Sequence, residues 1–95
     1  MAYKKSTATD DDLIDIYIYG HVNFSEAQAE KYFYELESVF EFLGDNPLVA
    51  REQLVGNQLL RIHPHASHQI IYQQTNYGIL IIRVLHKSML SALHL

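Results

Sequence analysis

A change in the spacing of apolar residues at Pro47 most constrains what this chain can fold into. Before Pro47 apolar side chains recur every three or four residues, and after it they recur every second residue. The first spacing is typical of helices that pack along one face, and the second is typical of strands in a sheet. A chain of 95 residues forms one small domain. We therefore expect residues 1–95 to form a single α+β domain in which helices precede most of the sheet.

Two helices are predicted in the first half of the chain. Three aspartates at 10–12 precede the apolar stretch at 13–19, and carboxylates there favour the positive end of a helix. Ser25 and Gln28 form a capping box for a second helix, which is expected to end within residues 44–47. The link between the two helices is short, so they are expected to form an antiparallel helical hairpin.

The first predicted helix carries two apolar strips. Leu13 and Tyr17 belong to a strip with helical spacing that is expected to pack inward, and Ile14 and Ile18 form a second strip beside it. A single solvated helix does not need both strips, so one of them is predicted to be covered by a partner. The alternative is that both strips are buried within the domain. The second helix has one inward strip, which consists of Ala29, Tyr32, Phe33, Leu36, Phe40 and Leu43.

The second half of the chain is predicted to form an antiparallel meander of three strands. They are expected at residues 59–63, 68–73 and 79–85, and the last two are joined by a hairpin turn at 75–78. Residues 3–7 are expected to add an edge strand, which gives a sheet of three to four strands packed on an N-terminal helical hairpin. Residues 87–95 are expected to form a short helix or a docked tail.

Charge is distributed unequally between the two halves. Residues 1–47 contain three lysines and ten acidic residues, a net charge of −7, whereas residues 48–95 contain four cations and one glutamate, a net charge of +3. One interpretation is an acidic partner that binds the second half, and the alternative is that the helical faces are acidic for solubility. The net charge of −4 and the lack of a basic helix argue against nucleic-acid binding as the primary role.

The chain shows neither a signal peptide nor a membrane span, which predicts a cytoplasmic location.

Two groups of residues could carry chemistry. His63, His65 and His68 invite a metal site, but a closed site needs one or two more ligands from His86 or a carboxylate. The alternative is a turn rich in polar histidines, so no metal or other cofactor is predicted. Arg61, Arg83 and His86 could supply the cations and the proton-transfer group of a metal-independent ribonuclease. The alternative for both arginines is that each anchors a carboxylate.

Several segments between residues 11 and 89 carry a family resemblance. They are DLIDIYIYG, NF, QAEKY, NP, RIHPHASHQIIY and RVLH. Together they resemble the ParE toxins of bacterial type II toxin-antitoxin modules, within the RelE/ParE superfamily. The resemblance implies a compact fold with a strand, a helical hairpin and an antiparallel meander. It also implies a toxin that poisons DNA gyrase and has no catalytic activity of its own.

The resemblance further implies partners and their binding residues. A ParD-like antitoxin is expected to form a hetero-oligomer with the toxin by wrapping an acidic, amphipathic C-terminal segment over it. The residues expected to contact the antitoxin are Leu13, Ile14, Tyr17, Ile18, Arg61 and Arg83. The residues expected to contact gyrase are His86, Lys87, Met89 and Leu90.

Some positions depart from the family pattern. Members usually open with L-S-x-x-A-x-x-D-L, and in this chain lysine stands at the leucine, Lys5, and threonine at the alanine, Thr9. An acidic residue often follows the C-terminal methionine, where this chain has Leu90. Two alternatives therefore stay open beside a gyrase poison. One is a ribonuclease of the RelE superfamily, and the other is a degenerate toxin that still binds antitoxin.

Overall fold

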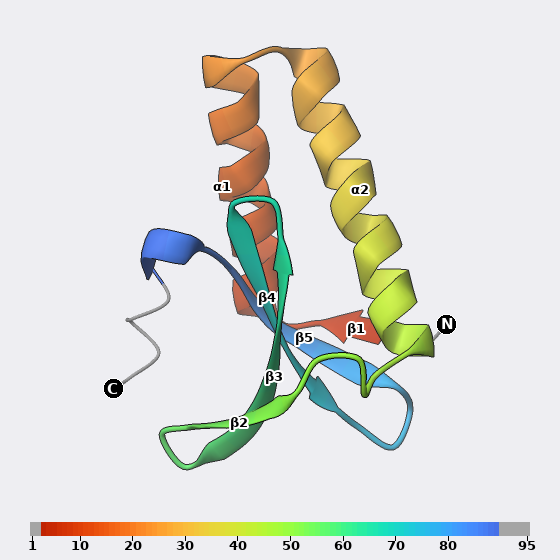
Figure 1. Cartoon of the computed structure of the whole chain (residues 1–95). Coiled ribbons are helices and arrows are strands. Elements are labelled where there is room, and N and C mark those ends of the chain that lie inside the picture. Colours follow the sequence, from red (N-terminus) through yellow and green to blue (C-terminus); the bar gives the residue numbers. More distant parts are fainter. Residues whose placement is uncertain (1–2, 90–95) are drawn as a thin grey trace.

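The computed structural model, which describes residues 3–89, has a helical hairpin packed on a twisted sheet (Figure 1). The elements in chain order are β1 (Tyr3–Lys5), α1 (Thr7–Asn23), α2 (Glu26–Asp45), β2 (Glu52–Val55), β3 (Gln58–His65), β4 (His68–Gln74) and β5 (Ile79–His86). A single turn of 3-10 helix follows at residues 87–89. The predicted α+β fold with its helical hairpin is confirmed. Leu90 and the rest of the predicted tail lie outside the described residues.

The sheet differs from the prediction in two respects. It has five strands in the order β1-β5-β4-β3-β2, not three to four, and β1 runs parallel to β5 whereas all other pairs are antiparallel. The strand missed is β2, which pairs with β3 across a tight turn in which Gly56 has a φ of 61°. Only four residues long and almost fully exposed, β2 lacks the buried alternation that marks a strand in a sequence.

The first helix begins one turn earlier than predicted. Ser6 is its N-cap, and the Ser6 Oγ accepts a hydrogen bond from the Thr9 backbone N–H at 3.0 Å. The three aspartates therefore lie inside α1, and Asp10 is in its first turn, which confirms a carboxylate near the positive end of this helix. The capping box of α2 is confirmed, since Ser25 Oγ accepts from the Gln28 N–H at 3.1 Å.

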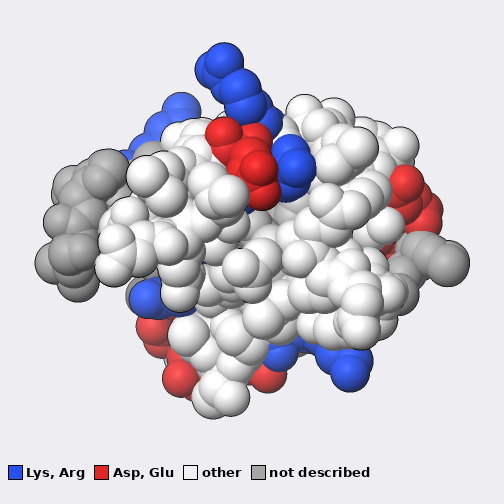
Figure 2. All heavy atoms as spheres, turned by 90° about the horizontal axis from the view of Figure 1, so that it is seen from below, with Lys and Arg blue, Asp and Glu red and all other residues white. Residues whose placement is uncertain are grey.

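The main core lies between the hairpin and the sheet. Leu36, Phe40 and Leu43 of α2 are fully buried, which confirms the predicted inward strip of that helix. Leu13 of α1 joins the same core, whereas Ile14 stays exposed. A smaller apolar cluster, Leu60, Ile71 and Leu85 with their neighbours, forms separately from the main core. Viewed from below the sheet, the surface is largely uncharged and charged side chains gather near its rim (Figure 2).

An irregularity in β5 decides how its last residues face the helices. Ile71 pairs with Arg83 while the next residue, Tyr72, pairs with Ile81, so Ile82 is an extra residue in β5. After the extra residue, side chains of β5 again alternate between the two faces of the sheet, but the residues that face the core are shifted by one position. Ile81 and Val84 consequently both belong to the main core although they are three residues apart.

No helix within residues 3–89 is long and apolar enough to cross a membrane.

Candidate functional site

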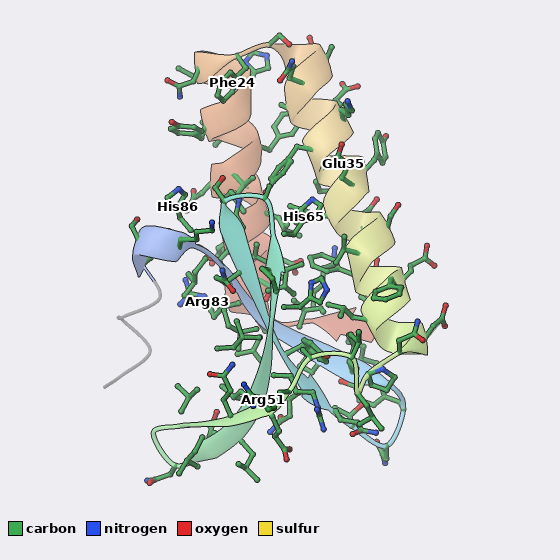
Figure 3. The ribbon with its side chains drawn as sticks, in the orientation of Figure 1. Phe24, Glu35, Arg51, His65, Arg83 and His86 are labelled. Carbon is green, nitrogen blue, oxygen red and sulfur yellow. The ribbon has the colours of Figure 1, made fainter. Side chains whose placement is uncertain are left out.

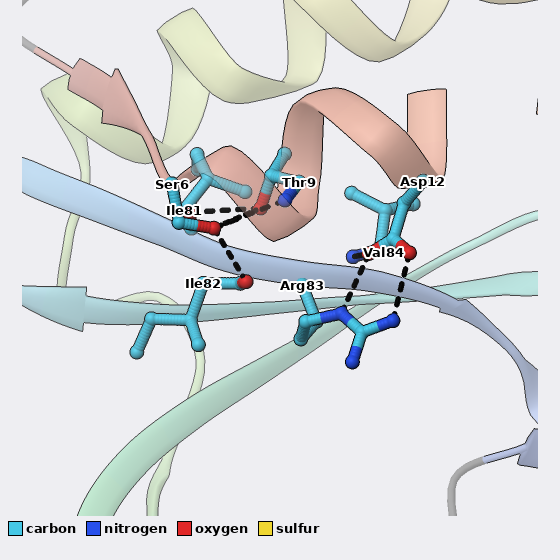
Figure 4. A network of polar contacts seen from close by, with 7 residues as sticks. All are labelled: Ser6, Thr9, Asp12, Ile81, Ile82, Arg83 and Val84. Atoms are coloured by element: carbon cyan, nitrogen blue, oxygen red, sulfur yellow. Dashed lines mark hydrogen bonds and ion pairs between the residues drawn. The ribbon is translucent and has the colours of Figure 1, made fainter. Parts of the chain in front are cut away.

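A row of polar side chains along α1 covers the edge of β5 that β1 leaves free. β1 pairs with β5 only as far as Ile81. At the point where this pairing ends, two side chains bind β5. The Thr9 hydroxyl donates to the Ile81 carbonyl at 2.9 Å, and the Ser6 hydroxyl donates to the Ile82 carbonyl at 2.8 Å (Figure 4). Thr9 is completely buried. The threonine that departs from the family pattern thus has a structural role, since it gives the Ile81 carbonyl a second hydrogen bond beside the one from the Ser6 backbone N–H.

Asp12 completes this row. Its carboxylate accepts from Arg83 Nε and Nη2, both at 2.8 Å, and from the Val84 backbone N–H at 3.0 Å (Figure 4). These hydrogen bonds raise the pKa of Arg83. The geometry is a two-pronged guanidinium–carboxylate pair, the strongest form of such contacts. It fixes α1 against β5, and it confirms that Arg83 anchors a carboxylate, here one of its own chain.

The other predicted arginine is also engaged within the chain. Arg61 Nη1 donates to the Ala50 carbonyl at 2.6 Å, and beside it the Tyr72 hydroxyl donates to the Pro47 carbonyl at 2.9 Å. These bonds hold the segment that links α2 to β2. Contact of Arg61 and Arg83 with an antitoxin remains a prediction.

The residues predicted for a ribonuclease lie in different rows of the sheet. Arg61, Tyr72 and Ile81 form one row, Arg83 pairs with Ile71 in the next, and His86 pairs with His68. At about 3.3 Å per residue, the backbone rows of Arg61 and His86 are roughly 13 Å apart. A joint role of Arg61, Arg83 and His86 in RNA cleavage stays a prediction.

An open groove lies on the exposed face of the helical hairpin, and we call it the hairpin groove. It has a volume of about 540 Å³. Its lining consists of Lys5, Asp10, Leu13, Ile14, Tyr17, Ile18, Glu30, Phe33 and Tyr34. Ile14 and Ile18 are 57% and 53% exposed although isoleucine is among the residues most often buried. The structure therefore brings together the four α1 residues predicted to contact a partner.

Three histidines form a second constellation, which consists of His65 and His68 from the group singled out in the sequence and of His86, named there as a possible further ligand. His65, His68 and His86 are direct neighbours across β3, β4 and β5. Tyr32 of α2 lies over this row, and its hydroxyl is 2.7 Å from His68 Nδ1. Figure 3 shows His65 and His86 at the same level of the sheet, with Glu35 on α2 beside His65. The distance from Glu35 Oε1 to His65 Nε2 is 3.6 Å.

The histidine row borders a second cavity, which we call the histidine pocket. Its volume is about 580 Å³. The lining consists of Ile16, Tyr19, Gly20, Phe24, Gln28, Ala29, Tyr32, Ser67, His68, His86 and Met89. Two of the residues predicted to contact gyrase, His86 and Met89, thus lie at one site, and Lys87 is exposed beside them.

Burial governs the protonation of the groups around the pocket. It raises the pKa of Tyr32 to about 12, with a further contribution from the nearby carboxylate of Glu35. Burial lowers the pKa of His68, and the neighbouring His86 and His65 lower it further. Tyr32 is therefore a neutral hydrogen-bond donor, and His68 is a neutral imidazole near pH 7. Within residues 3–89 no three potential metal-ligating side chains lie close enough to hold an ion.

The signal for this constellation is hidden in the sequence. Its histidines can be recognised as neighbours only once the pairing of three strands is known, because one residue of slippage places a side chain on the opposite face. The tight turn at Ala66, which has a positive φ of 52°, sets the pairing of His65 with His68. Tyr32 was expected as a core residue, and its hydroxyl contact with His68 has no signature in the sequence.

The fold places the chain in a known structural class. It is similar to a chain of the solved structure described as "Chromosomal ParDE TA system from P. aeruginosa", with a TM-score of 0.75 and 19% sequence identity. The likeness covers 90% of this chain and 95% of that one. No curated protein sequence matches the chain significantly.

The family follows from the sequence comparison. The family described as the ParE toxin of the type II toxin-antitoxin system parDE matches residues 3–91. The chain therefore belongs to the ParE toxin family, which confirms the resemblance inferred from its segments.

Proposed function

We propose that this chain is the toxin of a type II toxin-antitoxin module, that a cognate antitoxin neutralises it by covering the hairpin groove, and that the free toxin poisons DNA gyrase. Membership of the ParE toxin family supports the first part. The observation that carries the second is the exposure of Ile14 and Ile18 in the groove. A small monomer rarely leaves such a contiguous apolar surface in water unless a partner covers it.

The groove fits an amphipathic segment of the antitoxin. Its floor is apolar and aromatic, and its rim carries Lys5, Asp10 and Glu30. An amphipathic helix that lies in such a groove presents apolar anchors at helical spacing to the floor and polar groups to the rim. Full burial of an exposed isoleucine contributes about 1.5–3 kcal/mol, and since Ile14 and Ile18 are 57% and 53% exposed, a partner that covers them gains roughly half of this value at each.

The surface proposed for gyrase surrounds the histidine pocket. Lys87 and Met89 are exposed on the turn after β5, and His86 is exposed at the end of that strand. Methionine is enriched at contact surfaces between proteins. Leu90, which was predicted for the same surface, lies outside the described residues.

The experiment is a supercoiling assay with purified gyrase and the purified chain. We expect loss of supercoiling and accumulation of cleaved DNA, both reversed by the antitoxin encoded beside the toxin. The variant Lys87→Glu should weaken the effect on gyrase, whereas Lys31→Glu, an equally exposed lysine on α2, should leave it unchanged.

The same preparation distinguishes the alternatives. RNA cleavage without any effect on gyrase would contradict the proposal in favour of a ribonuclease. Antitoxin binding with neither activity would indicate a degenerate toxin.

A further inference from the structure

The histidine pocket lacks a charged lining but contains hydrogen-bond donors. None of its described lining residues is Asp, Glu, Lys or Arg, although the whole chain contains eleven acidic residues. Apolar side chains from the hairpin, such as Ile16 and Phe24, form one part of the wall, and the imidazoles of His68 and His86 form another. The ring centroids of these two histidines are 5.7 Å apart.

The hydrogen bonds of His86 determine where its proton lies. The Ser88 backbone N–H donates to His86 Nδ1 at 3.2 Å, and Ser88 Oγ is 2.9 Å from the same nitrogen. A nitrogen that accepts from a backbone N–H has a free lone pair, so the proton of the neutral ring is on Nε2. His86 therefore has its N–H donor at Nε2, on the side of the ring away from Ser88.

His68 has the same tautomer for a different reason. The Tyr32 phenol is neutral, and it is 2.7 Å from His68 Nδ1 but 3.4 Å from its other acceptor, the His65 carbonyl. The shorter distance favours donation of the phenol proton to Nδ1. The proton of His68 is then on Nε2, and no described residue accepts a hydrogen bond from Nε2 of His68 or His86.

We propose that the histidine pocket binds an acidic peptide segment of a protein partner, with an apolar side chain against Ile16 and Phe24 and a carboxylate on the Nε2–H groups of His68 and His86. Imidazole N–H groups donate whether the rings are neutral or protonated, and a carboxylate only accepts. The two Nε2–H groups thus match a carboxylate, which only accepts hydrogen bonds.

The charged and titratable neighbours are consistent with this assignment. Asp12 on α1 is held by Arg83, and Glu35 on α2 lies beside His65 on β3. Tyr32 is neutral, and Lys87 is the cation that follows His86 in sequence.

This inference goes beyond antitoxin binding at the hairpin groove. Residues 13, 14, 17 and 18 of α1 line the groove, whereas residues 16, 19 and 20 line the pocket, so the two sites lie on different faces of one helix. Either site can consequently fail its test without affecting the other.

The test is a titration of the whole chain, followed by nuclear magnetic resonance, with two matched probes. The first is acetyl-Phe-Asp-amide, and the second is acetyl-Phe-Asn-amide, which has the same shape without the charge. We expect the aspartate probe to bind about fivefold to tenfold more tightly at pH 6.5, because a charge-assisted hydrogen bond is roughly twice as strong as a neutral one. The shifted signals should include the amides of Ser88 and Met89.

Variants of the exposed His86 separate recognition from a general surface effect. His86→Phe should reduce the preference for the aspartate probe to within about twofold. His86→Gln, whose amide places an N–H near the position of Nε2, should keep the preference for the aspartate probe. His21→Gln changes a histidine outside the pocket and should behave as the wild type.

Three outcomes would overturn the proposal. They are equal binding of the two probes, an unchanged preference in His86→Phe, and the absence of saturable shifts at Ser88 and Met89 up to the solubility limit of the probes.

Discussion

Asp12 in α1 and Arg83 in β5 are 71 residues apart in sequence, and two hydrogen bonds of 2.8 Å join their side chains. The Asp12 side chain is 11% exposed and that of Arg83 is 38% exposed, so the pair lies at the boundary between interior and solvent. The same carboxylate also accepts from the Val84 N–H. The Asp12 carboxylate therefore accepts hydrogen bonds from a backbone N–H at the edge of β5 and from the Arg83 guanidinium. These bonds orient the helical hairpin on the sheet.

We expect a double-mutant cycle of Asp12→Ala and Arg83→Ala to give a coupling energy of about 1–2 kcal/mol in the free energy of unfolding. This value exceeds the zero to about 1 kcal/mol of typical surface pairs, because the geometry is two-pronged and Asp12 is nearly buried. Urea unfolding of the four proteins provides the measurement.

A matched control is available for this cycle. Lys5 and Asp10 form a single ion pair of 3.7 Å, and the Asp10 side chain is 55% exposed. Its coupling energy should be below about 0.5 kcal/mol. Equal coupling in the two pairs would contradict the role assigned to Asp12.

Thr9→Val should cost about 1 kcal/mol of stability. Valine has nearly the same shape, so the substitution removes the hydrogen bond to the Ile81 carbonyl and leaves the packing almost unchanged. Thermal unfolding measures the cost, and Thr7→Val, at an exposed position in the first turn of the same helix, serves as the control. A Thr9→Val protein as stable as the wild type would show that the hydroxyl contributes nothing.

Acid should destabilise the protein through His68. Burial lowers the pKa of this histidine in the folded state, so below the ordinary value of 6.5 the unfolded state binds more protons than the folded state. The stabilisation is fully present above pH 6.5 and is lost as the pH falls toward and below the lowered folded-state pKa. His63, whose pKa burial also lowers, adds to the same trend.

The measurement is the free energy of unfolding at pH 7.5, 6.5 and 5.5. His68→Asn keeps an acceptor near the position of Nδ1 but cannot titrate, so its stability should fall less over this range. His21→Asn, an exposed histidine, should keep the wild-type dependence. A dependence of wild-type size in His68→Asn would assign the effect to other groups.

Local patterns predicted much of this fold. The Ser25 capping box and the inward strip of α2 are readable because capping and helical packing depend on residues close in sequence. The same holds for α1, in which Leu13 is buried and Ile14 and Ile18 are exposed. Contact of the exposed strip with an antitoxin stays a prediction.

Features that depend on distant contacts were not predictable. The parallel pairing of Tyr3–Lys5 with β5 requires the whole chain to return to its start. The partner of Arg83 could not be identified from spacing, since Asp10, Asp11 and Asp12 are equal candidates until the cap at Ser6 sets the phase of α1. The histidine row depends on the register of three strands and on the bulge at Ile82.

The most direct test of the account is a calorimetric titration of the chain with the C-terminal segment of its cognate antitoxin. We expect tight binding by the wild type and at least about 100-fold weaker binding by Ile18→Asp, because a buried carboxylate would replace an apolar anchor. Val22→Asp, at an exposed position on the same helix outside the groove, should bind as the wild type. Equal affinity of Ile18→Asp and Val22→Asp for the segment would contradict neutralisation through the hairpin groove.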